Sequence, residues 1–260
     1  MSFDVPADAY LRFMGRYSEP LAVQFADLAG VRPGQRALDV GCGPGVLTAE
    51  LVRRLGTARV CAVEPSESFV AAARERLPGV DVRRAAAEKL PFPDGAFDVT
   101  AAQLVVHFMT DPVAGLREMA RVTRPGGVVA ACVWDHGGDR GPLTTFWRAA
   151  RQLDPSARNE SDGAGADEGA LAALFAAAGL GGAAATTLTV QVRYATFEQW
   201  WETFTLGVGP AGGYVTALAD DRCRLLRDHC RQLLPAEPLD VSATAWAVTG
   251  WRGNRMSGGA

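Results

Sequence analysis

The sequence lacks the features that mark several large classes of protein. It has no dense run of lysine or arginine and a formal net charge of −3 over 260 residues, so it offers no electrostatic footprint for nucleic acid. No stretch approaches the roughly 18 consecutive apolar residues of a membrane-spanning helix. The first residues, MSFDVPADAYLRF, contain no basic segment followed by an apolar core, as a secretory signal would. We therefore predict a cytoplasmic protein that binds neither nucleic acid nor a membrane.

Cysteine is sparse and scattered. The five cysteines are odd in number and widely spaced, which does not suit a disulfide framework. Cys223 and Cys230 lie on either side of His229, but seven residues of helix separate the two sulfurs by about 10 Å along the axis, too far to share one ion. We expect reduced thiols and no metal site.

Short apolar runs alternate with segments of helical periodicity over most of the chain. We predict strands at residues 36–40, 58–64, 80–84, 96–106, 128–134, 184–194 and 243–251. We predict helices at 10–28, 46–55, 67–77, 112–122 and 168–180, with a mainly helical segment at 196–234. Continuous apolar strands separated by helices indicate a parallel sheet covered on both faces, so the fold class is α/β and doubly wound.

The chain reads as a single domain, residues 1–260, with distinct parts. Residues 1–35 are expected to form an N-terminal helix, and residues 36–134 the main run of strands and helices. Residues 135–166 and 196–234 read as insertions around one sheet. The stretch RPGG, residues 124–127, is expected to close the preceding helix, and the glycine-rich, polar stretch of 135–166 is expected to be a mobile loop.

Three glycines at alternating positions follow an apolar run in LDVGCGPGVLT, residues 38–48. Gly41 and Gly43 let the backbone turn sharply and approach a ligand without a Cβ in the way, and Gly45 permits close packing or a further N–H contact. In an open parallel sheet such a turn lies at the ligand-binding edge. The dinucleotide pattern G-x-G-x-x-G/A fails in both registers, because its last glycine would fall on Val46 or Thr48.

Two acidic residues accompany the glycine turn. Asp39 stands two residues before the first glycine and favours a ligand whose charged amino-acid end lies over the turn; its alternative role is to cap that turn. Glu64 ends the next strand, nineteen positions after Gly45, where a carboxylate accepts hydrogen bonds from two ribose hydroxyls. Its alternative is a solvent-facing acid at a strand end.

Further motifs occur in a fixed order: LDVGCGPG, AVEPS, AEKLPFPDGAFDV, VHFMTDP and REMARVTRPGGVV. Over about residues 10–135 the chain resembles class I S-adenosylmethionine-dependent methyltransferases, of the type-11 group that includes ubiquinone and menaquinone biosynthesis methyltransferases. The resemblance implies S-adenosylmethionine as cofactor. It makes residues 36–134 the cofactor-binding core, residues 1–35 an N-terminal lid helix, and residues 135–166 and 196–234 insertions that cap the substrate site. It also implies a Rossmann-like seven-stranded sheet of order 3-2-1-4-5-7-6 with strand 7 antiparallel.

The resemblance also implies roles for individual residues. Gly41, Cys42 and Gly43 would contact the methionine part of the cofactor, Glu64 the ribose hydroxyls, and Gln103 the methionine amino group. On the adenine side, the resemblance implies contacts from Pro65, Ser66, Ala86, Ala87 and Glu88. The family often has an acid where this chain has Ala86, so the Ala87 backbone and Glu88 are the substitutes.

The first helix, in YLRFMGRYS, resembles the lid over the cofactor. Arg16 would pair with the cofactor carboxylate and Tyr10 would cover it, with Met14 beside them. The alternatives are a surface position for Arg16 and core positions for Tyr10 and Met14.

Three residues are candidates for the chemistry. Displacement at a sulfonium benefits from a positioned base. His107 follows strand 4 at the carboxyl edge of the sheet, and its alternative is a cofactor-side or packing histidine. Asp135 and His136 follow strand 5, and their alternative is a polar loop start. An aromatic set lines an apolar acceptor pocket or packs the insertion onto the sheet: Phe197, Trp200, Trp201 and Phe204, with Trp134 and Trp147.

These observations predict an S-adenosylmethionine-dependent transfer of methyl to oxygen, carbon or nitrogen of a small, apolar or aromatic molecule. The chain is expected to be a monomer or homodimer. Two alternatives stay open. In the first, the fold serves a non-methylating reaction such as cyclisation, and the alanine at position 86, where the family often has an acid, favours this alternative. In the second, the chain is a noncatalytic cofactor-binding partner subunit.

Overall fold

The structure is a computed structural model that describes residues 7–157 and 164–252. Seven strands form one sheet of order β3-β2-β1-β4-β5-β7-β6. Strands β1 to β5 pair in parallel, whereas β7 is antiparallel to both β5 and β6. The strands are Ala37–Val40, Val60–Glu64, Asp81–Arg84, Phe97–Gln103, Thr123–Trp134, Gly181–Tyr194 and Leu239–Trp251. The predicted sheet order and the antiparallel last strand are confirmed.

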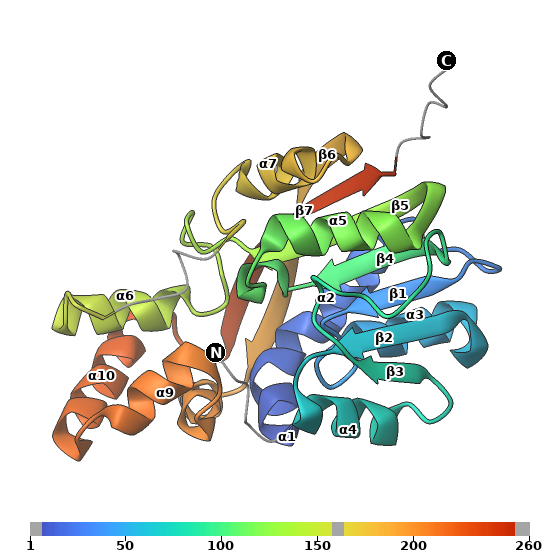
Figure 1. The fold of residues 1–260 in the computed structure, drawn as a ribbon. Coiled ribbons are helices and arrows are strands. Elements are labelled where there is room, and N and C mark those ends of the chain that lie inside the picture. Colours follow the sequence, from blue (N-terminus) through green and yellow to red (C-terminus); the bar gives the residue numbers. More distant parts are fainter. Residues whose placement is uncertain (1–6, 158–163, 253–260) are drawn as a thin grey trace, which may run out of the picture.

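Helices cover both faces of the sheet. Figure 1 shows α5 and α7 above the strands and α4 below them. The helices of the two layers are α2 (Arg16–Leu28), α3 (Val46–Leu55), α4 (Glu67–Arg76), α5 (Pro112–Val122) and α7 (Ala170–Ala177). Alternate residues of one strand belong to separate cores: Ala37 belongs to the cluster that includes residues of α2 and α3, and Leu38 to the cluster that includes residues of α5 and α7. This alternation follows from the two-residue period of a strand, and β1 is buried on both faces.

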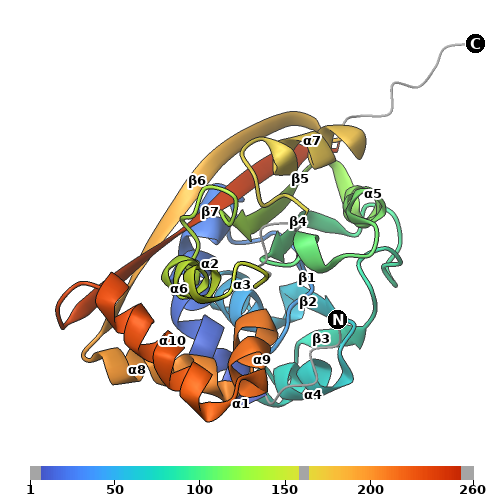
Figure 2. The same cartoon turned by 90° about the vertical axis from the view of Figure 1, so that its left-hand side faces the viewer.

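The remaining helices gather near one end of the sheet. They are α1 (Ala7–Tyr10), α6 (Thr144–Leu153), α8 (Phe197–Glu202), α9 (Gly209–Ala217) and α10 (Asp220–Leu233). Figure 1 places α6, α9 and α10 on the side toward which β3 and β4 point, and Figure 2 shows α8 and α10 near one end of the long strands β6 and β7. None of the described helices is long and apolar enough to cross a membrane.

Three local expectations were wrong. The N-terminal helix is not continuous, because Leu11–Gly15 forms a π-helical segment between α1 and α2. RPGG does not close α5, because these residues belong to β5, whose pairing with β4 begins at Thr123. The insertion after β5 contains α6, whose Phe146 and Trp147 are buried. Its polar stretch 158–163 lies outside the described residues.

Candidate functional site

The larger of two neighbouring cavities lies at the carboxyl ends of β1, β2 and β4. It has a volume of about 320 Å³. Six residues predicted from the first two βα turns line it: Asp39, Gly41, Cys42, Gly43, Glu64 and Pro65. The site therefore lies where an open parallel sheet binds its ligand.

The glycine turn has the backbone that its sequence predicts. Gly41 has φ +71°, and a Cβ there would lie 2.4 Å from a methyl carbon of Val105. Gly43 has φ +53°, and a Cβ there would meet no heavy atom within 4 Å. Gly45 does not line the larger cavity; a Cβ there would lie 2.8 Å from Leu77. Gly45 is therefore needed for packing of α3 on Leu77, one of the two roles expected for it.

The Glu64 carboxylate is held in place by backbone donors. One oxygen accepts from the Gly43 N–H at 2.9 Å and the other from the Ser66 N–H at 2.9 Å. The residue is only 7% exposed, and this burial raises the pKa of its carboxyl group. An ionised carboxylate offers about four acceptor positions, so two more hydrogen bonds can be accepted.

Asp39 is a buried acid in the wall of the same cavity. It is 1% exposed, and the Thr48 hydroxyl donates to it at 2.6 Å. Burial raises the pKa of Asp39 to about 7, with a further rise from the charge of Glu64 and an opposing effect of Thr48. Two acidic groups thus share one small, mainly desolvated region that would favour a cationic ligand group.

Two buried polar atoms beside the larger cavity lack partners. The Gln103 amide donates to the Ser18 carbonyl at 3.0 Å, whereas Gln103 Oε1 and Ser18 Oγ have no hydrogen-bond partner in the described part of the chain. Both residues line the cavity. Buried polar groups are almost always paired, so these atoms are candidates for ligand contacts. Ser18 was missed from the sequence.

The loop between β3 and β4 supplies a further wall. Ala86, Ala87 and Glu88 line the larger cavity, and their contact with adenine stays a prediction. One oxygen of Glu88 accepts from the backbone N–H groups of Thr110 and Asp111, at 2.8 and 3.2 Å. Glu88 therefore ties this loop to the start of α5 as well as bordering the cavity.

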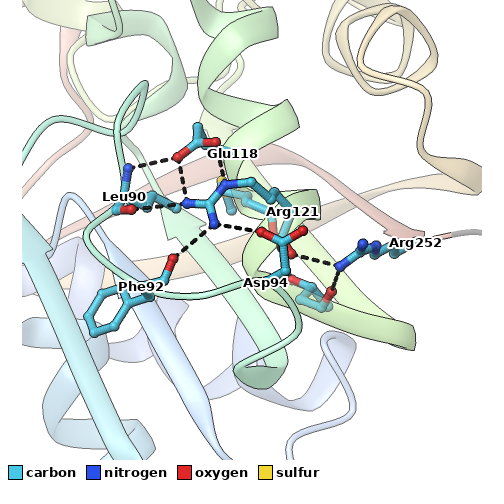
Figure 3. A network of polar contacts seen from close by, with 8 residues as sticks. Leu90, Phe92, Asp94, Glu118, Arg121 and Arg252 are labelled. Atoms are coloured by element: carbon cyan, nitrogen blue, oxygen red, sulfur yellow. Dashed lines mark hydrogen bonds and ion pairs between the residues drawn. The ribbon is translucent and has the colours of Figure 1, made fainter.

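Arg121 of α5 fastens the same loop (Figure 3). Its guanidinium donates to both oxygens of Glu118, at 2.6 and 2.8 Å, and to Asp94 at 2.9 Å. It also donates to the carbonyls of Leu90 and Phe92, at 3.0 and 2.9 Å. Hydrogen bonds from a charged donor to fixed carbonyls are stronger than an exposed ion pair. The position of residues 86–88 therefore depends on α5.

Replacing Arg121 by Met is expected to lower the unfolding free energy by about 2–3 kcal/mol, because Glu118 and two loop carbonyls lose a charged donor. Urea unfolding measures the change. Arg124→Met is the matched control: Arg124 is half exposed and pairs with Asp98, so a loss under about 1 kcal/mol is expected. Equal effects of the two substitutions would contradict a special role of Arg121.

The smaller cavity adjoins the larger one. It has a volume of about 50 Å³ and shares Tyr10, Leu104 and Phe108 with the larger cavity. His107 and His136 both line it, and their ring centroids lie 6.2 Å apart. Burial lowers the pKa of His107 to about 3 and that of His136 to about 4. The structure thus brings together two of the three residues predicted for the chemistry.

The third of these, Asp135, has structural partners. It is fully buried, accepts from the Gly138 N–H at 2.8 Å and is bound by the Arg140 guanidinium. It lines neither cavity. Asp135 therefore shapes the turn that carries His136.

Three more predicted cofactor residues lie outside the larger cavity. Met14 lines the smaller cavity. Arg16 is exposed, with its guanidinium carbon 4.9 Å from the centroid of the Tyr194 ring. The Ser66 hydroxyl accepts from the Phe69 N–H and so caps α4. Tyr10, in contrast, lines both cavities, and burial together with the charge of Glu64 raises its pKa to about 12.

The aromatic set divides between lining and packing. Trp134 lines the smaller cavity. The four aromatic residues of 197–204 are buried and line neither cavity. They therefore pack the insertion, which is the second of the two roles expected for them. Phe204 stacks on Phe146, with centroids 4.5 Å apart, and meets the edge of Phe13 at 5.7 Å. Since Phe13 lines the smaller cavity, this packing fixes one of its walls.

Leu104 and Phe108 border both cavities and were missed from the sequence. Leu104 has φ +61°, a conformation that is uncommon for a non-glycine residue and that collects at functional sites. Nothing in the sequence predicts this conformation. Phe108 could have been predicted from the VHF stretch, because this stretch follows β4 directly.

A parallel sheet with a glycine turn after its first strand and an acid after its second defines the class of Rossmann-like proteins that bind nucleoside cofactors. Within that class, a sequence-family profile described as "Methyltransferase domain" matches residues 38–131.

Comparisons with individual proteins narrow the class further. An uncharacterized methyltransferase of Mycobacterium sp. (strain JLS) is 36% identical over 202 residues, 73% of this chain and 79% of that protein. The ubiquinone/menaquinone biosynthesis C-methyltransferase of Burkholderia orbicola is 40% identical over 116 residues, 41% of this chain and 48% of that protein. Two further curated relatives, an uncharacterized methyltransferase of Schizosaccharomyces pombe and an uncharacterized 37.1 kDa protein of Streptomyces fradiae, are matched over 52% and 33% of their own length. The chain belongs to the S-adenosylmethionine-dependent methyltransferase family.

Solved structures share the fold. The crystal structure of the YcgJ protein from Bacillus subtilis superposes with a TM-score of 0.57 at 20% identity, covering 92% of this chain and 99% of that chain. At this identity the likeness concerns the fold alone.

Proposed function

We propose that this chain transfers the methyl group of S-adenosylmethionine to a small, largely apolar or aromatic molecule. The observation that carries the proposal is that the two cavities adjoin each other. Tyr10, Leu104 and Phe108 line both of them. The larger cavity suits the cofactor and the smaller one the reacting end of the acceptor. A cofactor in the larger cavity and an acceptor in the smaller one would therefore meet where these three side chains line both cavities.

The residues of the larger cavity fit this cofactor. Glu64 has acceptor positions left for ribose hydroxyls, and Gly43 leaves open space where a side chain would project. Gln103 Oε1 is a buried acceptor for the ammonium of the methionine end, and Ser18 Oγ is a donor for its carboxylate. Glu88 and the Ala87 backbone would serve the adenine. These roles account for the two unpartnered polar atoms that the fold leaves beside the cavity.

S-adenosylmethionine, when bound, supplies a methyl group on a sulfonium that a nucleophile displaces in line. The protein's part is to orient both reactants and to keep water out. Holding two reactants in reactive geometry accounts for several kcal/mol of barrier reduction. Tyr10, Phe108 and Leu104 would do this by closing the junction of the cavities, and the packing of Phe13 on Phe204 would keep the acceptor side rigid.

Calorimetry with S-adenosylmethionine and S-adenosylhomocysteine tests the binding step. We expect both to bind with dissociation constants well below millimolar, and an isotopically labelled methyl group to pass to members of a panel of small apolar acceptors. Failure of both ligands to bind at millimolar concentration would refute the proposal. Binding without transfer to any acceptor would favour a non-methylating reaction or a partner-subunit role instead. A cytoplasmic location and a monomeric or homodimeric state stay predictions from the sequence.

A further inference from the structure

Two buried nitrogens on side chains that line the smaller cavity lack a partner among the described residues, His107 Nδ1 and Trp134 Nε1. His107 lies in the 3₁₀ turn Val106–Phe108 that follows β4, and it is one of the residues that line the cavity. Its Nδ1 atom is buried, and none of the described residues pairs with it. Buried polar atoms left unpaired beside a cavity mark positions that a ligand atom can complete. The indole N–H of Trp134 can only donate, so the imidazole nitrogen of His107 is the one that can accept a hydrogen bond.

The surroundings of this nitrogen carry no formal charge. Among the described residues that line the smaller cavity there is no Asp, Glu, Lys or Arg. Both histidines are neutral at neutral pH, because burial lowers the pKa of His107 to about 3 and that of His136 to about 4. An ammonium or carboxylate would lose its hydration here without gaining an opposite charge. An uncharged hydroxyl loses much less and can donate to an imidazole nitrogen.

We propose that the acceptor presents an uncharged hydroxyl, such as that of a phenol, to the smaller cavity, and that His107 Nδ1 accepts its hydrogen bond and then its proton. This rests on the proposed methyl transfer and names the reactive group of the acceptor. As the hydroxyl oxygen bonds to the methyl carbon, the bond from that carbon to sulfur breaks and its electron pair stays on sulfur. The O–H proton passes to His107, so the positive charge leaves sulfur and arrives on the imidazole.

A weakly basic imidazole suits a proton transfer that occurs late in this step. A free phenol holds its proton far too tightly for such an imidazole to remove it beforehand. An oxygen that has gained a methyl group and still carries its proton is a much stronger acid than an imidazolium. The proton therefore moves to His107 as the new bond forms. The other titratable groups at this cavity are Tyr10 and His136, and Asp135 behind His136 is bound by Arg140.

The size of the cavity limits what it encloses. Its volume of about 50 Å³ is a third of the ~150 Å³ of an engineered cavity that holds benzene. It therefore accommodates the hydroxyl and the few atoms next to it. The rest of the acceptor extends past Phe108, which borders both cavities and is 43% exposed.

The test uses phenols of increasing size, each with aminomethyl, carboxylate and methoxy counterparts on the same ring. Calorimetry on the complex with S-adenosylhomocysteine measures binding, and labelled methyl measures transfer. We expect phenols to bind at least tenfold more tightly than their charged or methylated counterparts and to be the compounds that are methylated.

Two variants test whether His107 itself takes the proton. His107→Asn keeps a hydrogen-bond acceptor but takes no proton, so kcat for a phenol is expected to fall about 100-fold while KM and the affinity for S-adenosylhomocysteine stay within threefold. His229→Asn is the control, because His229 lies on α10, hydrogen-bonded to Gln152 and outside both cavities.

Nuclear magnetic resonance gives a readout that does not depend on turnover. The chain has three histidines, so selective ¹⁵N-histidine labelling yields few resonances. Adding a phenol to the complex with S-adenosylhomocysteine should move the Nδ1 resonance of His107 and leave that of His229 unchanged.

The outcomes distinguish this inference from the proposed function. Methylation of the amines or carboxylates in preference to the phenols would overturn the hydroxyl assignment and leave methyl transfer standing. A loss of S-adenosylhomocysteine affinity in His107→Asn that matches the loss of kcat would place His107 on the cofactor side and overturn its role as proton acceptor. Absence of S-adenosylhomocysteine binding by the unaltered protein would refute the proposed function itself.

Discussion

Substituting Gln for Glu64 is expected to weaken the binding of S-adenosylhomocysteine at least tenfold, or about 1.4 kcal/mol. The carboxylate already accepts from the N–H groups of Gly43 and Ser66, and its remaining acceptor positions are those available to ribose hydroxyls. A glutamine of the same shape replaces one acceptor oxygen by an NH₂ donor. It would face one of these backbone N–H groups with a donor and offer fewer positions to the ribose. Isothermal titration calorimetry measures the loss.

Two comparisons make this result specific. Glu67→Gln, three residues along the chain, is the control: its carboxylate is 83% exposed and pairs with Arg84, so cofactor affinity should not change. Glu64→Ala removes the acceptor for both N–H groups and should also lower the unfolding free energy, by about 1–3 kcal/mol. Unchanged affinity in Glu64→Gln would remove Glu64 from the cofactor site.

The sequence predicted the individual strands because they carry strong local signals, whereas the strand order was implied by the resemblance to a known family. β1, β2 and the 128–134 part of β5 are mainly apolar runs, and the helices between the strands have clear periodicity and caps, such as Ser66 before α4 and Asp111 before α5. Local signals of this kind survive in a single sequence. The positions of Glu64 and Gly41 follow directly from the order of strand, turn and strand.

The parts of the site that the sequence did not predict depend on contacts between distant segments. The contact between Gln103 and the Ser18 carbonyl joins residues 85 positions apart. The left-handed backbone of Leu104 has no residue-type signal, because leucine does not favour it. Arg16 was assigned to the cofactor from its place in the lid segment. The π-helical segment before it changes the register of the helix, and Arg16 lies on the outer surface over Tyr194.

Substituting Asn for Asp39 is expected to act in opposite directions on stability and on cofactor binding. The folded pKa of Asp39, about 7, lies above its usual value of 3.8 because the group is buried. The folded state therefore binds this proton more tightly than the unfolded state. Stability from this group is lost as pH rises from about 4 to 7, with a slope approaching about 1.4 kcal/mol per pH unit. Asp39→Asn should accordingly be more stable than the unaltered protein at pH 8, by roughly 2–4 kcal/mol.

The difference in unfolding free energy between Asp39→Asn and the unaltered protein separates the pH effect of Asp39 from that of the two histidines. His107 and His136 have lowered pKa values, so burying them neutral costs stability as pH falls below about 6.5, the reverse of the Asp39 effect. Both contributions remain in Asp39→Asn and cancel when the two unfolding curves are subtracted. Urea unfolding at several pH values between 4 and 8 provides the curves.

Cofactor binding should respond the other way, because an ionised Asp39 attracts the ammonium at the methionine end of the ligand. The affinity of the unaltered protein for S-adenosylhomocysteine should therefore fall as pH drops below 7, while that of Asp39→Asn should be about tenfold weaker at pH 8 and nearly independent of pH. Asp98→Asn is a control in which the expected effect on stability is reversed. Asp98 pairs with Arg124, and this partner holds the pKa of the Asp98 carboxyl group below its usual value. Replacing Asp98 should therefore lower stability at pH 8 and leave the affinity for S-adenosylhomocysteine unchanged. If Asp39→Asn bound as tightly as the unaltered protein at pH 8, Asp39 would serve only to hold Thr48 and the glycine turn.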